Sequence, residues 1–355
     1  MPINSNCPTH TALPYYHHLM PSLLDLPNEL LCEITDYFPV FVAVPEADFL
    51  GITANEYDRE DVLRALSRTC VRLRSVFLPL LWARVHAVFT QRRQRRKPRT
   101  REKAVETRLA ALRRATDLHD YVRYLAVTMD ECTPDNWHGM VELIRVLSVL
   151  PNLRRVVLSG MAQYAGSLLA SSVAEKHFTS VTELYISHLS TNHVAILSAF
   201  PNVRELGVKD NNNGMNAVLV KAIADILPGL TVMKNVMLSG ASAADVATLS
   251  AIRESFRSLQ KITIKGRIVP ETLHALAPLP ALRELTIRYR TPQSWEKDVP
   301  TPEALTAAGR EVLSRCGRGG TTHAQPERVL RMEYVGPRSW WDHGGPVDRV
   351  EVFVL

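Results

Sequence analysis

The sequence has no long hydrophobic run, and this absence narrows the class of protein. The longest unbroken apolar run of the 355-residue chain covers residues 40–44, whereas a membrane-spanning helix needs roughly 20 apolar residues. The first residues also lack the charged and then apolar pattern of a signal peptide. We therefore expect a soluble protein of the cytoplasm, the nucleus or both.

Cysteine is also scarce, and its spacing excludes two kinds of stabilising site. The five cysteines are far apart, without a CxxC pair: Cys7, Cys32, Cys70, Cys132 and Cys316. An odd count fits no disulfide framework, and the spacing fits no zinc site. We expect reduced thiols, no bound metal and no cofactor.

Catalytic motifs are missing as well. The sequence contains no GxSxG, HExxH, Walker A or GxGxxG pattern. The single "GRGG" stretch follows no predicted strand, so it does not form a phosphate-binding loop. We expect a protein that is not an enzyme. A hydrolase or transferase on an unrecognised fold remains an alternative, which turnover by the purified chain would reveal.

The net charge of +6 comes from one segment. Residues 92–103 carry +7, so the rest of the chain carries −1. This segment is interpreted as a solvated linker, a nuclear-import signal, or a contact for nucleic acid or an acidic protein. It has no interleaved aromatic residues with which to stack on bases, which disfavours nucleic acid as a partner.

Three short helices are predicted near the N terminus. Apolar residues with helical spacing begin at Leu26, and Pro27 is tolerated in a first turn. A second helix is expected over residues 57–77 with Asp58 as its cap, and Pro79 is expected to open a third. So small a bundle has little core of its own.

These helices resemble an F-box. The stretch "LPNELLCEI" (residues 26–34) follows the family pattern Leu-Pro-x-Glu-Leu-Leu-x-x-Ile, and "LRALSRTCVRLRSVFLPLLWARV" (residues 63–85) follows its Cys/Arg-rich continuation. This residue pattern is similar to that of fungal F-box proteins that carry leucine-rich repeats. The long loop between the first two helices departs from the pattern.

The resemblance implies docking on an SKP-family adaptor and, through it, on a cullin-RING ubiquitin ligase. An apolar helix face would meet an apolar groove of the adaptor. The residues expected to bind the adaptor are Leu26, Pro27, Leu30, Leu31, Ile34, Leu63 and Leu66. The alternative is that these residues only pack an ordinary helical hairpin.

A unit of three apolar residues, at its first, fourth and sixth positions, recurs seven times after the basic segment. The seven copies are Val122/Leu125/Val127, Leu153/Val156/Leu158, Val181/Leu184/Ile186, Val203/Leu206/Val208, Met233/Val236/Leu238, Leu259/Ile262/Ile264 and Leu282/Leu285/Ile287. Their spacing of 22 to 31 residues is near that of leucine-rich repeats. Each copy predicts a strand followed by a helix, stacked into an arc with the strands inside.

Residues between the apolar positions are expected on the concave face of this arc. We expect a target protein to bind there, with lysine and arginine favouring an acidic feature and the other residues supplying apolar contact: Tyr185, Met237, Lys261, Lys265 and Arg288. The alternative is an inert, solvated strand face.

The predicted fold is α+β, mostly an α/β solenoid, with a small three-helix F-box-like segment before a leucine-rich-repeat-like arc. Its predicted parts are a flexible tail (1–20), the F-box-like segment (21–90), a basic linker with a connecting helix (91–120), and the repeats with a C-terminal cap (121–355). The expected function is substrate recognition in an SCF-type ubiquitin ligase. The alternative is a repeat scaffold for protein–protein interaction outside any ligase.

Overall fold

The fold is seen in a computed structural model. It describes residues 26–37, 54–87, 99–129, 138–161, 163–209, 215–240, 242–277, 279–290, 299–316, 327–335 and 347–355. The predicted tail (1–20) and most of the basic segment lie outside these ranges. No helix within them is long and apolar enough to cross a membrane.

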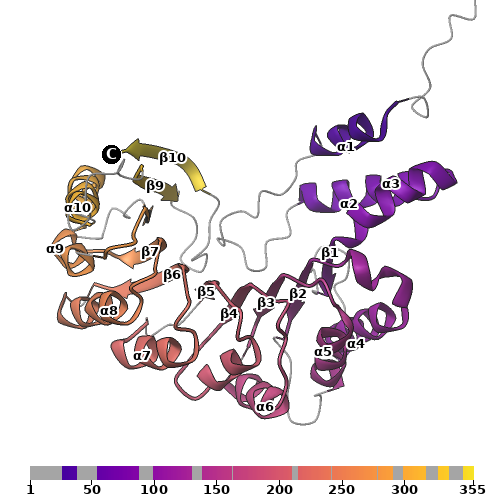
Figure 1. Cartoon of the computed structure of the whole chain (residues 1–355), viewed down its shortest axis with the longest axis horizontal. Coiled ribbons are helices and arrows are strands. Elements are labelled where there is room, and N and C mark those ends of the chain that lie inside the picture. The colour runs from indigo at the N-terminus through magenta and orange to yellow at the C-terminus, as the bar shows by residue number, and fades with distance from the viewer. Residues whose placement is uncertain are drawn as a thin grey trace, which may run out of the picture.

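Three helices come first along the described chain (Figure 1). They are α1 (Asn28–Tyr37), α2 (Ala54–Leu66) and α3 (Val71–Trp82). The prediction of one helix over residues 57–77 is wrong, because the chain breaks between α2 and α3. The hydroxyls of Ser67 and Thr69 bind carbonyls of the last turn of α2. The sulfur of Cys70 then caps α3, 3.5 Å from the backbone nitrogen of Leu73.

Two predicted helix starts are also wrong. Asp58 lies inside α2 rather than at its cap. Pro79 lies inside α3, and its carbonyl accepts a hydrogen bond from the backbone N–H of Ala83 at the helix end. Sequence spacing alone did not show whether Pro79 begins a helix or lies near the end of one, because proline is compatible with a helix start as well as with a distorted last turn.

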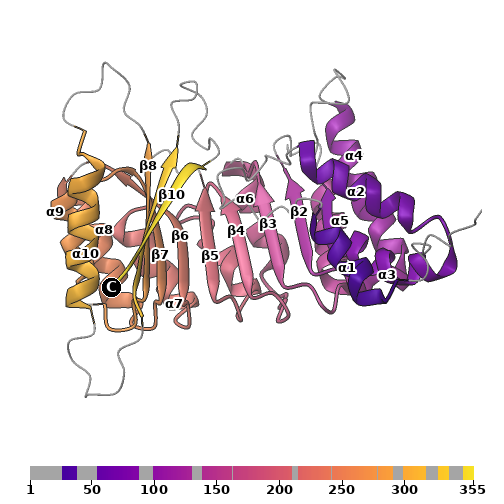
Figure 2. The ribbon, with the colours of Figure 1, turned by 90° about the horizontal axis from the view of Figure 1, so that it is seen from above.

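A single curved sheet follows, with its strands in sequence order. The strands are β1 (Arg84–Ala87), β2 (Tyr124–Thr128), β3 (Arg155–Ser159), β4 (Glu183–Ser187), β5 (Glu205–Lys209), β6 (Val232–Ser239), β7 (Lys261–Arg267), β8 (Glu284–Arg290), β9 (Val329–Val335) and β10 (Val347–Val354). Neighbours from β1 to β9 are parallel, and β10 runs antiparallel to β9. Figure 2 shows the strands side by side.

Helices connect successive strands and cover the outer face of the sheet (Figure 1). They are α4 (Arg99–Arg114), η2 (Thr116–Tyr121), α5 (His138–Val149), α6 (Gln163–Val173), η3 (Val194–Ala199), α7 (Ala217–Ile226), α8 (Ser242–Ser255), α9 (Pro270–Leu273), η4 (His274–Leu276) and α10 (Pro302–Arg315). The described helices leave the inner, concave face of the sheet uncovered. The fold is therefore a mixed α/β arrangement with one helix-covered face.

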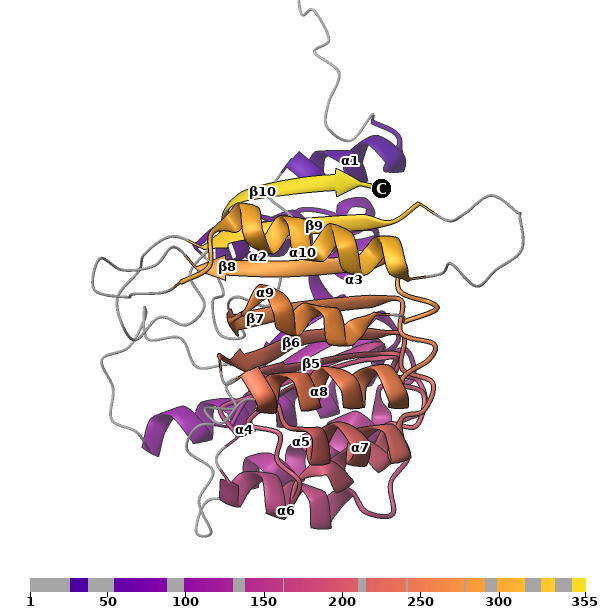
Figure 3. The ribbon, with the colours of Figure 1, turned by 90° about the vertical axis from the view of Figure 1, so that its left-hand side faces the viewer.

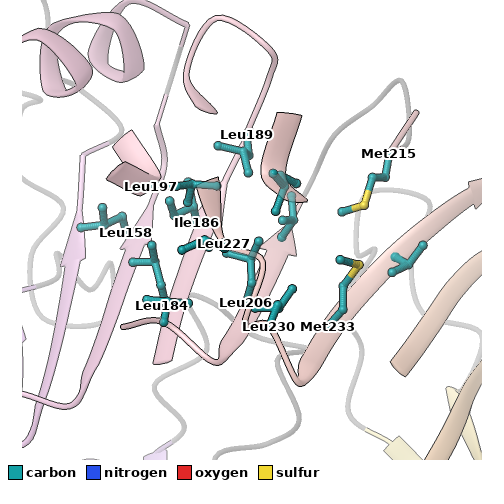
Figure 4. Packing of buried hydrophobic residues seen from close by; sticks show 14 of the residues in the cluster. Leu158, Leu184, Ile186, Leu189, Leu197, Leu206, Met215, Leu227, Leu230 and Met233 are labelled. Atoms are coloured by element: carbon teal, nitrogen blue, oxygen red, sulfur yellow. The ribbon is translucent and has the colours of Figure 1, made fainter. Parts of the chain in front are cut away.

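The strand in each of the seven predicted copies is confirmed, from β2 to β8. The apolar residues of neighbouring strands pair in register, as Leu125 does with Val156 and Leu184 with Leu206. They are fully buried and form one continuous core, part of which is drawn in Figure 4. Burial of these rows between strands and helices is the main stabilising term of the sheet.

The fifth copy is displaced from its predicted phase. Met233 pairs with Ile262 and Val236 with Ile264, so β6 has one more residue than β7 between the two pairs. The extra residue forms a β-bulge, in which Asn235 adopts a left-handed backbone with φ of 59°. Met233 is therefore the second apolar residue of this copy and not the first, and Leu230 takes the first position.

The sheet begins before residue 121. Strand β1 pairs with β2 directly after α3, and Val105, Leu109 and Leu112 of α4 belong to the core of the sheet. The helix expected to connect two domains is thus part of the outer layer (Figure 3). The domain boundaries themselves stay a prediction.

Candidate functional site

The inner side of the three-helix bundle is a small core. Leu31 of α1 and Leu63 of α2 are buried against Leu73 and Phe77 of α3. Leu26 and Leu66 are partly buried against the same core. Leu31 and Leu63 thus pack the bundle from inside, and their predicted contact with an adaptor stays a prediction.

The outer side of the bundle exposes apolar residues. Leu30 is 42% exposed and Val71, the first residue of α3, is 86% exposed. Pro27 is exposed as well. The guanidinium of Arg72 donates to the carbonyl of Leu26 over 2.7 Å, which fastens the start of α1 to the start of α3.

The contact between Arg72 and Leu26 thus joins the start of α1, where Pro27 and Leu30 are exposed, to the start of α3, where Val71 is exposed. The structure confirms exposure for two residues of the predicted adaptor-binding set, Pro27 and Leu30. Val71 was missed, because it lies within a stretch that was predicted as continuous helix. The side chain of Ile34 lies outside the described part of the chain.

The concave face presents residues in rows across the strands. The first row runs from Tyr124 on β2 through Arg155, Glu183 and Glu205 on the next three strands. In the second row, Tyr185 of β4 packs with Ala126, Val157 and Tyr124 in a small apolar cluster. These rows define the part of the concave face that begins at β2.

Tyr185 is the centre of a set of polar contacts on this face. Its hydroxyl donates to the carboxylate of Glu205 and accepts from the ammonium of Lys234, which is 3.1 Å away. Lys234 also lies 2.7 Å from Glu205. The guanidinium of Arg155 lies 5.4 Å from the centre of the Tyr185 ring, within cation–π range.

The charges of this set alter each other's proton affinity. Burial alone would raise the pKa of Glu205, but Lys234, the Tyr185 hydroxyl and Arg155 outweigh it and lower that pKa below its usual value. Burial likewise opposes the charged form of Arg155, but Tyr185, Glu183 and Glu205 raise its pKa overall. Glu205 and Arg155 are therefore both charged at neutral pH.

Toward the C-terminal end, the basic residues of the concave face have acidic neighbours. Lys261 is exposed and lies 2.8 Å from Glu284 on β8. Arg288 is buried, and its guanidinium donates twice to Glu333 on β9, over 2.9 and 3.1 Å.

Two of the three basic residues predicted to bind the target are therefore buried, and their role in binding stays a prediction. Arg288 is buried in its ion pair, and Lys265 is buried too. Met237 is half-buried and pairs in register with Lys265. The face therefore carries charges of both signs on neighbouring strands instead of presenting one sign.

Lys234 is the residue of this face that the sequence reading missed. The predicted phase of β6 placed Asn235 and Met237 on the concave side. The bulge turns Asn235 into a buried position and leaves Lys234 beside Tyr185. Asn235 itself was the one sequence signal of this bulge, because asparagine tolerates the left-handed conformation.

Chemical sites are scarce in the described ranges. No group of three or more His, Cys, Asp and Glu side chains is arranged there to hold a metal ion. Cys70 and Cys316 are thiols without a disulfide, and burial raises the pKa of Cys316. The expected lack of a metal, a cofactor and catalytic activity stays a prediction.

Comparison with known proteins identifies the first part of the chain. Residues 7–104 match the family model described as an F-box-like domain. The match covers α1 to α3, β1 and the first part of α4, and so confirms the F-box resemblance of the N-terminal helices. The comparison with curated proteins gives no match.

Proposed function

We propose that this chain, with its F-box-like domain, is the substrate-recognition subunit of an SCF-type (cullin-RING) ubiquitin ligase. Its F-box-like helices would bind an SKP-family adaptor, and its curved sheet would hold the protein to be ubiquitinated. We further propose that the strand–helix units are leucine-rich repeats. F-box domains generally bind SKP1-type adaptors, which supports the coarser role of a protein-interaction adaptor.

One observation supports adaptor binding most directly. The bundle buries Leu31 and Leu63 completely and yet leaves Leu30 and Val71 in solvent. Exposed apolar side chains gathered at one place are typical of a protein-interaction site. A few such residues, once buried by a partner, supply most of the binding free energy.

The concave face is the proposed target surface. The outer helices leave it uncovered, and it holds the half-buried Met237 and the exposed Lys261, whereas Tyr185 is buried within its own contacts. Its basic side chains have carboxylates beside them, so we propose a target with charges of both signs rather than a uniformly acidic one. Complementary charges would set the orientation and the specificity of binding more than its strength.

The proposed contribution to ubiquitination is proximity. Holding a target beside a charged ubiquitin carrier raises the effective concentration of the reacting groups without chemistry by the receptor itself. We propose that the chain acts in this way in the cytoplasm or nucleus and has no catalytic activity of its own.

Co-purification with an SKP-family adaptor tests the proposal. We expect the full chain to retain the adaptor, and the Pro27→Ala/Leu30→Ala variant to lose it while its thermal unfolding is unchanged. Val218→Ala is the matched control, because Val218 is 67% exposed but lies on α7, away from the bundle. Failure of the wild-type chain to bind would contradict the proposal and favour a scaffold outside any ligase.

A further inference from the structure

The last strand of the sheet exposes a row of valines. Val350, Val352 and Val354 of β10 are 47%, 52% and 59% exposed. They pair in register with Glu333, Arg331 and Val329 of β9, on the concave side of the sheet. Figure 1 places β10 at the end of the curved sheet opposite α1, and in the described chain its one strand partner is β9.

The backbone of the same three valines points away from β9. Leu355 and Arg328 exchange both backbone hydrogen bonds, over 2.9 and 3.5 Å, so they form a hydrogen-bonded pair of the antiparallel ladder. Such pairs alternate along two antiparallel strands, which makes Phe353 and Glu351 hydrogen-bonded to β9 as well. The N–H and C=O groups of Val350, Val352 and Val354 therefore face the outer edge.

The register of β10 against β9 is irregular between Val347 and Arg349, but from Val350 to Val354 the described strand is regular and lacks the features that usually prevent strand pairing. Natural edge strands are blunted by outward lysines, prolines or bulges. At the three positions of β10 with outward backbone groups there are only valines, the residues that favour a strand most strongly. Both backbone hydrogen bonding and side-chain packing are thus available for an added strand.

The sequence of β10 is complementary to itself. If two copies pair antiparallel about an axis at Val352, then Val352 faces its own copy and Val350 faces Val354. All three valines gain a β-branched partner on the same face, which is a favourable cross-strand pair. An axis at Glu351 would place two carboxylates opposite each other.

We propose that β10 is a dimerisation strand, through which a second copy of this chain extends the sheet antiparallel with its axis at Val352. Both copies use the same strand in this contact, so the assembly is complete with two chains, as in any two-fold symmetric dimer. Glu351 is already ion-paired with Arg349 within its own strand, which limits repulsion between the two copies. The dimer would present two concave faces on one continuous sheet.

The mass of the full chain in solution tests this inference. We expect wild type at micromolar concentration to have twice the chain mass of 39.8 kDa by light scattering. Val352→Pro removes an outward N–H while leaving the hydrogen bonds to β9, so we expect a monomer with nearly unchanged thermal unfolding. Val352→Lys is a second variant in case proline perturbs the strand, and Val218→Lys on α7 is the matched control that stays dimeric.

Cysteine crosslinking tests the register. Across a hydrogen-bonded antiparallel pair the Cα atoms are about 5.5 Å apart, within disulfide range. Oxidation should therefore crosslink Val352→Cys, whereas Val350→Cys residues would be about 14 Å apart and stay uncrosslinked. The wild-type chain, with its own thiols, controls for other crosslinks. A monomeric wild type, a dimer that persists in both Val352→Pro and Val352→Lys, or equal crosslinking at positions 350 and 352 would overturn the inference.

Discussion

The ammonium of Lys234 on β6 lies 2.7 Å from the carboxylate of Glu205 on β5, and the hydroxyl of Tyr185 on β4 binds both groups. One set of hydrogen bonds therefore spans three neighbouring strands of the concave face. The set depends on Gly207, because a Cβ atom at that position would lie 2.3 Å from the Tyr185 ring. The ring can lie across β5 only where that strand has no side chain.

Gly207→Ala should consequently displace Tyr185 and disturb its contacts with Glu205 and Lys234. We expect a loss of about 1–3 kcal/mol in the free energy of unfolding, the usual cost of overpacking. Urea denaturation measures this loss. Gly229→Ala is the control, because a Cβ atom there meets nothing within 4 Å. Equal stability of the two variants would contradict the assigned packing.

The buried pair of Arg288 and Glu333 gives a second prediction. Arg288→Met leaves a buried carboxylate without its partner, so we expect a loss of about 3–5 kcal/mol. The double variant Arg288→Met/Glu333→Leu removes both charges and should recover most of that loss. Thermal and urea unfolding of the wild type and the three variants of the double-mutant cycle measure the coupling. A double variant as unstable as the sum of the single ones would argue against the pairing.

The third prediction concerns acid stability. Burial, then Arg84 and Arg108, lower the pKa of His86 on β1 to about 4. The unfolded chain, with an ordinary histidine pKa of about 6.5, then binds more protons than the folded chain between these values. Stability from neutral His86 is present above pH 6.5 and is lost as pH falls toward 4, by at most about 3 kcal/mol.

Replacing His86 removes this titration. His86→Gln should flatten the fall of unfolding free energy between pH 6.5 and 4, measured by urea denaturation at several pH values. His177→Gln, at an exposed position, should leave the wild-type slope in place. An unchanged slope in His86→Gln would show that other groups cause the acid sensitivity.

Adjacent leucines of α1 should respond differently to truncation. Leu31→Ala opens a cavity in the bundle and should cost about 2–5 kcal/mol of the stability of α1–α3. Leu30→Ala changes an exposed side chain and should stay within about 0.5 kcal/mol of wild type. Hydrogen exchange of the bundle amides separates the two outcomes, and equal protection in both variants would refute the assignment of inner and outer sides.

The repeated part of the fold was predictable because its signal is redundant. Every unit buries its apolar residues in the same rows, so a strand such as β3 or β4 is recognised by its agreement with its neighbours. The F-box-like helices were recognisable from "LPNELLCEI" and its continuation. Both signals are patterns of residue type within one short segment, so they can be recognised without knowing how distant segments pair.

Single residues that change the phase were not predictable in the same way. The bulge at Asn235 inserts one residue into β6 and brings Lys234, not Asn235, beside Tyr185. The charge pairs across strands depend on the register between segments far apart in the chain. The sequence alone therefore does not show that Glu284 lies beside Lys261 or that Glu333 lies beside Arg288. Spacing within one segment contains no information about the neighbouring strand.

The affinity of the full chain for an SKP-family adaptor, measured by calorimetry, tests the central proposal most directly. We predict that Leu30→Asp weakens binding at least about tenfold, because it places a charge in a desolvated apolar contact. Val218→Asp on α7 should bind as wild type does. Adaptor binding that is absent in the wild-type chain, or unchanged in a folded Leu30→Asp variant, would contradict the account.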